Sequence, residues 1–526
     1  MKISINYITL GSFALIMACS APKENETKVF TEAEIAAESK KANDFFEETF
    51  QKDLDGSPEE QSYLGIKKDY DKWDDYSDKK AQEDLEITKA NLQYLLDSIN
   101  PEALDKQTSI SYRLFKEDAE NEIADFDWRF HNYPVHQMYG MHTGAPSFLI
   151  NIHQVADSSD AAAYISRLKG IEPMFNQIIE NLKTREDKGI VPPQFVFPRV
   201  IEASKNVIKG APFENGNPST LLADFESKVN ALEISDEFKA QFIESAKSAL
   251  VRNVKPAYEK MISFLEDQET RATTDDGAWK WPNGDEFYAI ALKRTTTTNL
   301  TPEEIHEIGL KEVERIHGEM KQIMERVNFD GTLQEFFEFM RTQPMFYYPN
   351  TDEGKVAYID SATSIINNME NRLDELFITK PKARIKVKRV EKFRENSAGK
   401  AFYQSPAPDG SRPGTYYANL ADTKNMPKYE MEALAYHEGI PGHHMDRSIS
   451  QELTGIPKFR KYGGHTAFKE GWGLYSEFIP KEMGMYKNPY SDFGRLAMEI
   501  WRACRLVVDT GIHLKNGLVK RVLITT

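Results

Sequence analysis

The chain has 526 residues, of which 40% are hydrophobic and 28% are charged, as is typical of a soluble globular protein. This length allows one large core or two to three domains. The formal net charge of −16 argues against nucleic-acid binding and against attachment to a membrane through a basic surface.

The N-terminus is typical of a targeting segment. Its apolar run over residues 8–17 is too short for a transmembrane helix and suits a signal peptide. The run ends in Ile-Met-Ala-Cys, which resembles the bacterial lipobox, where the cysteine becomes the acylated first residue. We therefore expect a signal peptide over 1–18, lipidation of Cys19 and a flexible tether over 19–30. These features predict a protein of the bacterial cell envelope, exposed to the periplasm or cell surface and held to the membrane only through its lipid.

Helical signals begin near Thr31 and continue through most of the chain. The clearest is Thr301-Pro302-Glu303-Glu304, which combines a cap, a first-turn proline and a glutamate three residues after the cap. Further long segments have helical periodicity, namely 31–50, 78–98, 159–184, 219–267 and 355–377. Only residues 383–390 show the alternation of apolar and polar residues that is typical of a strand. We predict a mostly α fold with a small β element.

Stretches rich in Pro, Gly and aromatic residues predict irregular structure at 132–153, 189–200 and 396–420. A cluster of Thr, Asp, Gly and Pro near residues 273–285 is the best candidate for a domain boundary. We therefore divide the chain into an N-terminal helical region, 31–284, and a metal-binding catalytic region, 285–526. The alternative is one continuous domain over 35–526.

Three of the 11 histidines lie within eight residues, at His437, His443 and His444. The residues before His437 favour a helix, so we expect His437 and Glu438 to lie on one. In the familiar zinc-protease motif, two histidines four residues apart share an ion, and the glutamate beside the first is the base. Here the fourth residue after His437 is Pro441, so that strict motif is absent.

On an ideal helix, His443 lies about 240° around and about 9 Å along from His437, whereas His444 faces the same way about 10.5 Å along. Either can share an ion with His437 only if the helix bulges or breaks, which Pro441 and Gly442 favour. We predict His443 as the second ligand and keep His444 as the alternative. The competing interpretation is a helix end followed by two surface histidines.

A third ligand is needed for a site that keeps one position open for water. Glu470 and Glu477 are seven residues apart and can share a helix face, so spacing alone allows either. Further along, one helix face carries a polar stripe that is either a buried ion network or a wall of the site. The stripe contains Arg502, Arg505, Asp509 and His513.

Four segments together resemble DUF885, a widespread bacterial family of unknown function whose metal site is related to that of gluzincin-type metallopeptidases. They are RPGTYYAN at 412–419, HEGIPGHH at 437–444, EGWGLYSE at 470–477 and RLVVDTGIH at 505–513. The likeness runs from about residue 35 to residue 513. It implies a large α-helical, metallopeptidase-like fold with a cleft between helical subdomains.

The same resemblance implies Zn²⁺ held by His437, His443 and Glu470, with Glu438 as the base. The expected reaction is hydrolysis of peptide or peptide-like amides, in which Glu438 moves a proton from water to the leaving amine. We expect Tyr416, Tyr417 or His513 to stabilise the oxyanion. Two other classes stay open: a non-catalytic metal-binding lipoprotein, and a metal hydrolase of esters or non-peptide amides.

After His513 the family usually continues for tens of residues, whereas residues 514–526 do not resemble it. A truncation or frameshift would produce such a tail. We expect this change to remove one wall of the site.

Overall fold

The computed structural model describes residues 29–514. The expected signal peptide, Cys19, most of the tether and the tail from residue 515 lie outside the described residues. The fold is mostly helical with one small sheet, which confirms the predicted fold class. Within residues 29–514, none of the helices combines the length and the apolar character needed to cross a membrane.

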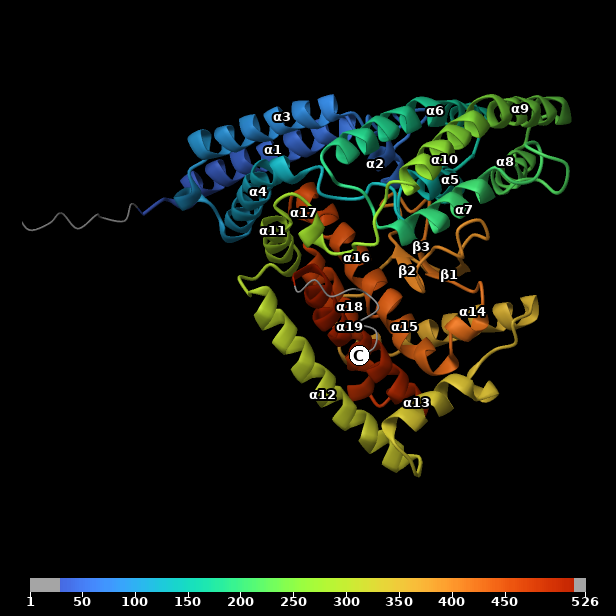
Figure 1. The fold of residues 1–526 in the computed structure, drawn as a ribbon. Coiled ribbons are helices and arrows are strands. Elements are labelled where there is room, and N and C mark those ends of the chain that lie inside the picture. Colours follow the sequence, from blue (N-terminus) through green and yellow to red (C-terminus); the bar gives the residue numbers. More distant parts are fainter. Residues whose placement is uncertain (1–28, 515–526) are drawn as a thin grey trace, which may run out of the picture.

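The first part of the chain forms a layer of helices at the top of Figure 1. They are α1 (Glu32–Asp55), α2 (Pro58–Tyr63), α3 (Asp78–Ser98), α4 (Lys106–Asp125), α5 (Met141–Asn151), α6 (Ser158–Asp187), α7 (Phe197–Val207), α8 (Thr220–Asn230), α9 (Asp236–Ala249) and α10 (Lys255–Glu269). A short π-helix, Leu250–Val254, joins α9 to α10. The apolar faces of α5 to α10 enclose a core that contains Phe175, Phe225 and Tyr258.

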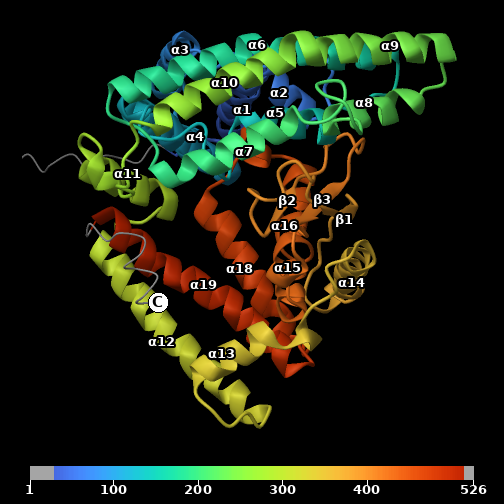
Figure 2. The ribbon, with the colours of Figure 1, turned by 45° about the vertical axis from the view of Figure 1, so that its right-hand side comes forward.

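The rest of the chain lies below this layer (Figures 1 and 2). Its helices are α11 (Gly284–Thr296), α12 (Pro302–Arg326), α13 (Leu333–Thr342), α14 (Asp352–Glu370), α15 (Met431–Glu438), α16 (His443–Glu452), α17 (Lys458–Tyr462), α18 (Thr466–Glu482) and α19 (Pro489–Leu514). The long helices α12 and α19 pack along each other. Two further cores form here, one among α12, α13 and α19 and the other among α14, α15 and the sheet.

The sheet has three strands in the order β1-β3-β2. β1 (Ile385–Arg389) is parallel to β3 (Gly414–Ala418), and β2 (Ala401–Gln404) is antiparallel to it. Every residue of the central strand β3 is buried. The sheet lies beneath α5 and α7 and above α14 and α15, so it connects the helical layer to the lower part of the chain (Figure 1).

The predicted start of α12 is confirmed, because the Thr301 hydroxyl accepts a hydrogen bond from the Glu304 amide and the Glu304 side chain reaches back to the Thr301 amide. A single helix over 219–267 is wrong, since the chain leaves α8 and begins α9 at a new cap, Ser235. Irregular structure over 396–420 is also wrong, because β2 and β3 lie there. β3 is buried at every residue and β2 is half-buried at every residue, so neither strand has an alternating pattern to reveal it. The division at residues 284/285 stays a prediction.

Candidate metal centre

The helix that carries His437 ends directly after it, and the chain turns back on itself. α15 stops at Glu438, and a new helix, α16, starts at His443. Gly442 is required at this turn, because a Cβ there would lie 1.9 Å from the carbonyl oxygen of His437. The broken helix brings the His437 and His443 rings to 4.6 Å between centroids.

A third side chain joins these two rings from α18. One ligand atom from each of His437, His443 and Glu470 lies within 4.8 Å of the others. The Glu470 carboxylate faces both imidazoles, at 3.7 Å from His437 Nε2 and 3.6 Å from His443 Nε2. Two imidazoles and one carboxylate are a donor set that suits zinc, and three protein ligands leave a coordination position free. The described residues therefore fit the metal that the sequence resemblance implies.

Glycine at position 473 allows α18 to approach this closely. A Cβ on Gly473 would lie 2.6 Å from Cε1 of His437 and 2.9 Å from its Nε2. The neighbouring Trp472 donates its indole N–H to the carbonyl oxygen of Pro441 at 2.9 Å, which ties α18 to the turn between the two histidines. The local sequence thus holds α18 against His437.

Glu477 lies behind His437 rather than among the ligands. Its Oε1 is 2.9 Å from His437 Nδ1 and 3.0 Å from the guanidinium of Arg502, and its side chain is only 1% exposed. Arg502 Nη2 also lies 3.1 Å from His437 Nδ1. When Nδ1 donates its proton to the Glu477 carboxylate, the Nε2 lone pair is left for an ion. Spacing alone allowed Glu470 or Glu477 as the ligand, and the structure brings Glu470 into the cluster.

The electrostatics of the cluster favour a cation. Burial opposes a charged His437, but hydrogen bonds with Glu470 and Glu477 outweigh it and raise the pKa of His437 to about 9. Burial and the neighbouring His437 lower the pKa of His443 to about 4, so its lone pair stays available. The same negative field that holds a proton on His437 attracts a divalent ion.

Glu438 lines the same cavity as the three ligands but is not one of them. It is 6% exposed, its Oε2 has no hydrogen-bond partner in the part of the chain that the structure describes, and burial raises its pKa to about 7. A buried carboxylate with a free oxygen and a pKa near neutrality has the properties of a general base.

His444, the alternative ligand, points away from the cluster. Its Nε2 donates to the carbonyl oxygen of Ala383 at 3.0 Å, and its Nδ1 accepts from the Tyr403 hydroxyl at 2.9 Å. These bonds place His444 between α16 and the sheet, where it holds the two together.

The three predicted oxyanion donors do not line the metal cavity. Tyr416 is fully buried, with its hydroxyl 3.5 Å from that of Tyr358. Tyr417 donates to the side-chain oxygen of Gln404 at 3.2 Å. His513 accepts from the backbone amide of Ala278 at 2.9 Å and so anchors the end of α19. Their expected catalytic role therefore finds no geometric support.

The polar stripe on α19 divides into two parts. Arg502 and Arg505 line the metal cavity, whereas Asp509 accepts a hydrogen bond from the Tyr288 hydroxyl outside it. Sequence reasoning missed the link from Arg502 through Glu477 to His437. The seven-residue spacing of Glu470 and Glu477 indicated that both lie on one helix face. It could not show which of them is the ligand and which supports His437.

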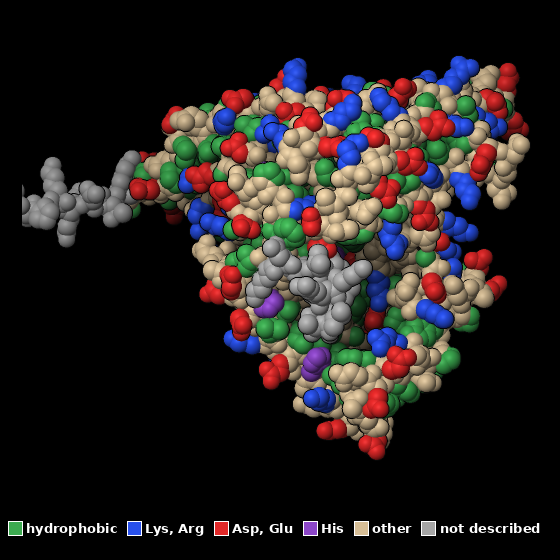
Figure 3. Space-filling view, viewed as in Figure 1, with side chains coloured by type: hydrophobic (Ala, Val, Ile, Leu, Met, Phe, Trp, Pro, Cys, Tyr) green, Lys and Arg blue, Asp and Glu red, His purple; other side chains and the backbone are tan. Residues whose placement is uncertain are grey.

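The metal cavity has a volume of about 420 Å³. Figure 3 shows a hollow with basic side chains at its wall, between the helical layer and the lower part of the molecule. The lining residues come from the segment before α5, from β2 and its flanks, and from α15, α16, α18 and α19. A cavity of this volume between two parts of the chain is typical of a site for a small ligand, which includes a short peptide.

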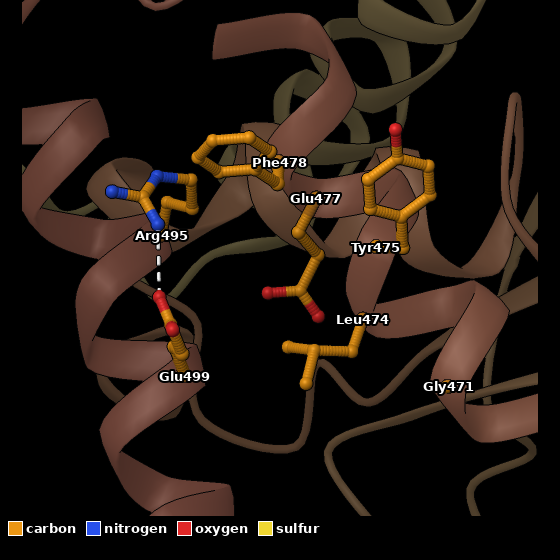
Figure 4. Close-up of a pocket in the computed structure, with 7 residues that line it drawn as sticks. All are labelled: Gly471, Leu474, Tyr475, Glu477, Phe478, Arg495 and Glu499. Carbon is orange, nitrogen blue, oxygen red and sulfur yellow. Dashed lines mark hydrogen bonds and ion pairs between the residues drawn. The ribbon is translucent and has the colours of Figure 1, made fainter. Parts of the chain in front are cut away.

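A second cavity of about 250 Å³ lies on the other side of Glu477. Figure 4 shows the Glu477 carboxyl group pointing into the space between Leu474 and Glu499, with the Arg495–Glu499 ion pair beside it. Glu477 Oε2 has no hydrogen-bond partner among the described residues. Glu477 therefore connects the metal cluster to a hollow between α18 and α19.

Comparisons with known proteins agree with the fold. A family model described as a bacterial protein of unknown function (DUF885) matches residues 58–521. No curated protein matches the chain. A candidate lipoprotein from Colwellia psychrerythraea has a similar crystal structure, with a TM-score of 0.85, 25% identity and coverage of 93% of this chain and 86% of that one. A candidate lipoprotein of unknown function from Shewanella oneidensis has a TM-score of 0.57 at 17% identity, over 90% and 84% of the two chains, and shares the fold alone.

Proposed function

The chain belongs to the DUF885 family of bacterial proteins, and from this premise we propose that it is a zinc-dependent hydrolase of short peptides or peptide-like amides in the cell envelope. The observation that carries the proposal is the pairing of a three-ligand cluster with the buried carboxylate of Glu438 in one cavity, where Glu438 Oε2 has no hydrogen-bond partner among the described residues. A purely structural zinc site has four protein ligands. Within residues 29–514 the cluster has three.

His437, His443 and Glu470 would hold the ion. Zinc there would supply Lewis acidity at the scissile carbonyl and lower the pKa of the attacking water. Glu438 accepts the proton of that water at Oε2 and returns it to the leaving amine. Arg502 and Glu477 hold the His437 ring in its orientation, so they act as positioning residues.

The envelope location rests on the lipobox-like sequence that ends in Cys19 and on the candidate lipoproteins with a similar fold. A lipid on Cys19 would hold the catalytic body at a membrane surface, so its substrates would be peptides of the envelope.

The test combines metal analysis with a substrate screen. Elemental analysis of the purified protein should find about one zinc per chain, and dialysis against a chelator should remove it together with the activity. A peptide library, screened beside ester and non-peptide amide panels, should show cleavage of peptides. Absence of stoichiometric metal would reject the proposal, and cleavage confined to esters would replace the peptidase with another hydrolase.

A further inference from the structure

The metal cavity has an excess of positive charge, although the whole chain has a net charge of −16. Its basic lining residues come from three helices and from the residue before β2, and they are Lys400, Arg447, Lys469, Arg502 and Arg505. The carboxylates of the lining are Glu438 and Glu470, and both belong to the proposed metal chemistry. Any carboxylate that neutralises these basic residues must therefore lie outside the cavity lining or belong to a ligand.

Three of the five have such partners. Lys400 forms an ion pair with Glu430. Arg447 lies 2.8 Å from Asp446, and Arg502 lies 3.0 Å from Glu477. These charges are neutralised within the protein and are not available to a ligand.

Lys469 and Arg505 have no ion pair or side-chain hydrogen bond within residues 29–514. Lys469 directly precedes the ligand Glu470 on α18. Its Nζ and the guanidinium of Arg447 both lie 3.9 Å from the position that a Cβ on Gly464 would take, and the charges of Arg447, Asp446 and Glu470 all act on the lysine. Arg505 lies one turn beyond Arg502 on α19, with its guanidinium 5.6 Å from the ring centroid of Trp501.

An unpaired cation in a concave site is stabilised by an anion, and its field raises the local concentration of anionic ligands. A bound zinc ion would add further positive charge. We propose that Lys469 and Arg505 recognise a carboxylate group of the substrate, so that the site selects anionic peptides. This inference rests on the proposed function for its peptide substrate and adds the feature by which that substrate is chosen. The carboxylate is either the free C-terminus or an acidic side chain.

Binding to a zinc-loaded, full-length Glu438→Gln protein tests the proposal without turnover. The probes are three N-acetylated tripeptides: Ala-Ala-Ala with a free C-terminus, Ala-Ala-Ala amide and Ala-Ala-Glu amide. Titration calorimetry should find at least one anionic probe bound on the order of tenfold more tightly than the neutral amide, which corresponds to about 1.4 kcal/mol. The tighter of the two anionic probes identifies the source of the carboxylate.

Substitution of both residues, Lys469→Gln with Arg505→Gln, should reduce this preference to less than about twofold. A carboxylate can also bind zinc directly, so elemental analysis must find the same zinc content in each variant. The matched control substitutes Arg252→Gln and Lys487→Gln, which are exposed, lie outside the cavity and form no ion pair within the described residues. The control should keep the preference.

Equal binding of all probes, a preference that survives the double substitution, or no binding of any probe would overturn the inference. Failure of the proposed function would give a different result. The wild-type protein would then cleave no peptide, although its preference for carboxylate probes would still depend on Lys469 and Arg505.

Discussion

His437 and Glu477 form a buried pair in which the imidazole Nδ1 lies 2.9 Å from the carboxylate Oε1. The two residues are 40 positions apart and come from different helices, α15 and α18. The pair fixes which nitrogen of the ring faces Glu470. A conservative change at Glu477 should therefore alter the metal site without touching any ligand.

Glu477→Gln should weaken zinc binding by about 10- to 100-fold, because the amide can accept the Nδ1–H bond but lacks the charge that makes the imidazole more basic. Competition with a chromophoric chelator measures the Kd. The exposed Glu482→Gln on the same helix is the control and should bind zinc as the wild type does. An unchanged Kd in Glu477→Gln would show that this carboxylate does not support the ligand.

Gly473→Ala should displace the His437 ring, since its Cβ would lie 2.6 Å from Cε1 of that ring. We expect zinc affinity to fall on the order of tenfold or more. Loss of a side chain that orients a metal ligand has an effect of this size. Gly471→Ala is a matched control on the same helix, because its Cβ would meet nothing within 4 Å. Equal zinc affinity in the two variants would contradict this contact.

The adjacent histidines should separate metal binding from stability. His443→Ala should lose stoichiometric zinc, because one of three ligands is removed. His444→Ala should keep its zinc but lose about 2–3 kcal/mol of unfolding free energy, because a buried ring with two hydrogen bonds is replaced by a cavity. Elemental analysis measures the zinc content and urea denaturation measures the unfolding free energy. Loss of zinc in His444→Ala but not in His443→Ala would show that His444 is the ligand.

Glu438→Gln should keep its zinc and lose about 10²- to 10⁴-fold in kcat, the range expected when a general base is removed. The substitution preserves shape and leaves the three ligands in place. Hydrolysis of the best substrate from the peptide screen gives the rate. A kcat within a fewfold of wild type would reject Glu438 as the base.

His142 should make the N-terminal layer sensitive to acid. Burial, with a smaller contribution from His136, lowers its pKa to about 3, and neither ring nitrogen has a hydrogen-bond partner between residues 29 and 514. The unfolded chain protonates this ring below about pH 6.5 whereas the folded chain does not, so stability falls as the pH drops from 6.5 towards 3.

At pH 5 this effect amounts to about 2 kcal/mol. His142→Leu removes the titrating group without leaving a broken hydrogen bond, so its stability should fall less between pH 7.5 and pH 5 than that of the wild type. Urea denaturation at the two pH values compares the variants. An equal loss of stability in both would show that His142 does not titrate as described.

Much of the architecture could be predicted from local patterns. Helical periodicity located α1, α3 and α6, with α1 predicted to end at residue 50 rather than Asp55, and the capping residues located the start of α12, because these signals act within one turn or one face of a helix. The interruptions in 219–267, the half-buried strand β2 and the buried strand β3 were missed. Their structure depends on partners elsewhere in the chain, which periodicity does not report.

By itself, the sequence determined which residue types could hold an ion and that the helix after His437 had to be disturbed, because Pro441 and Gly442 cannot continue it. Spacing allowed either Glu470 or Glu477 as the ligand, and the family resemblance favoured Glu470. Tertiary structure decided that Glu470 faces both imidazoles while Glu477 lies behind one of them, and that Tyr416, Tyr417 and His513 have other partners. The physical reason is that capping residues, proline and glycine act on the backbone of their own neighbourhood, whereas the direction of a side chain depends on how helices pack. Seven residues of spacing place two glutamates on one face of α18, but only the position of α15 against that face gives them different roles.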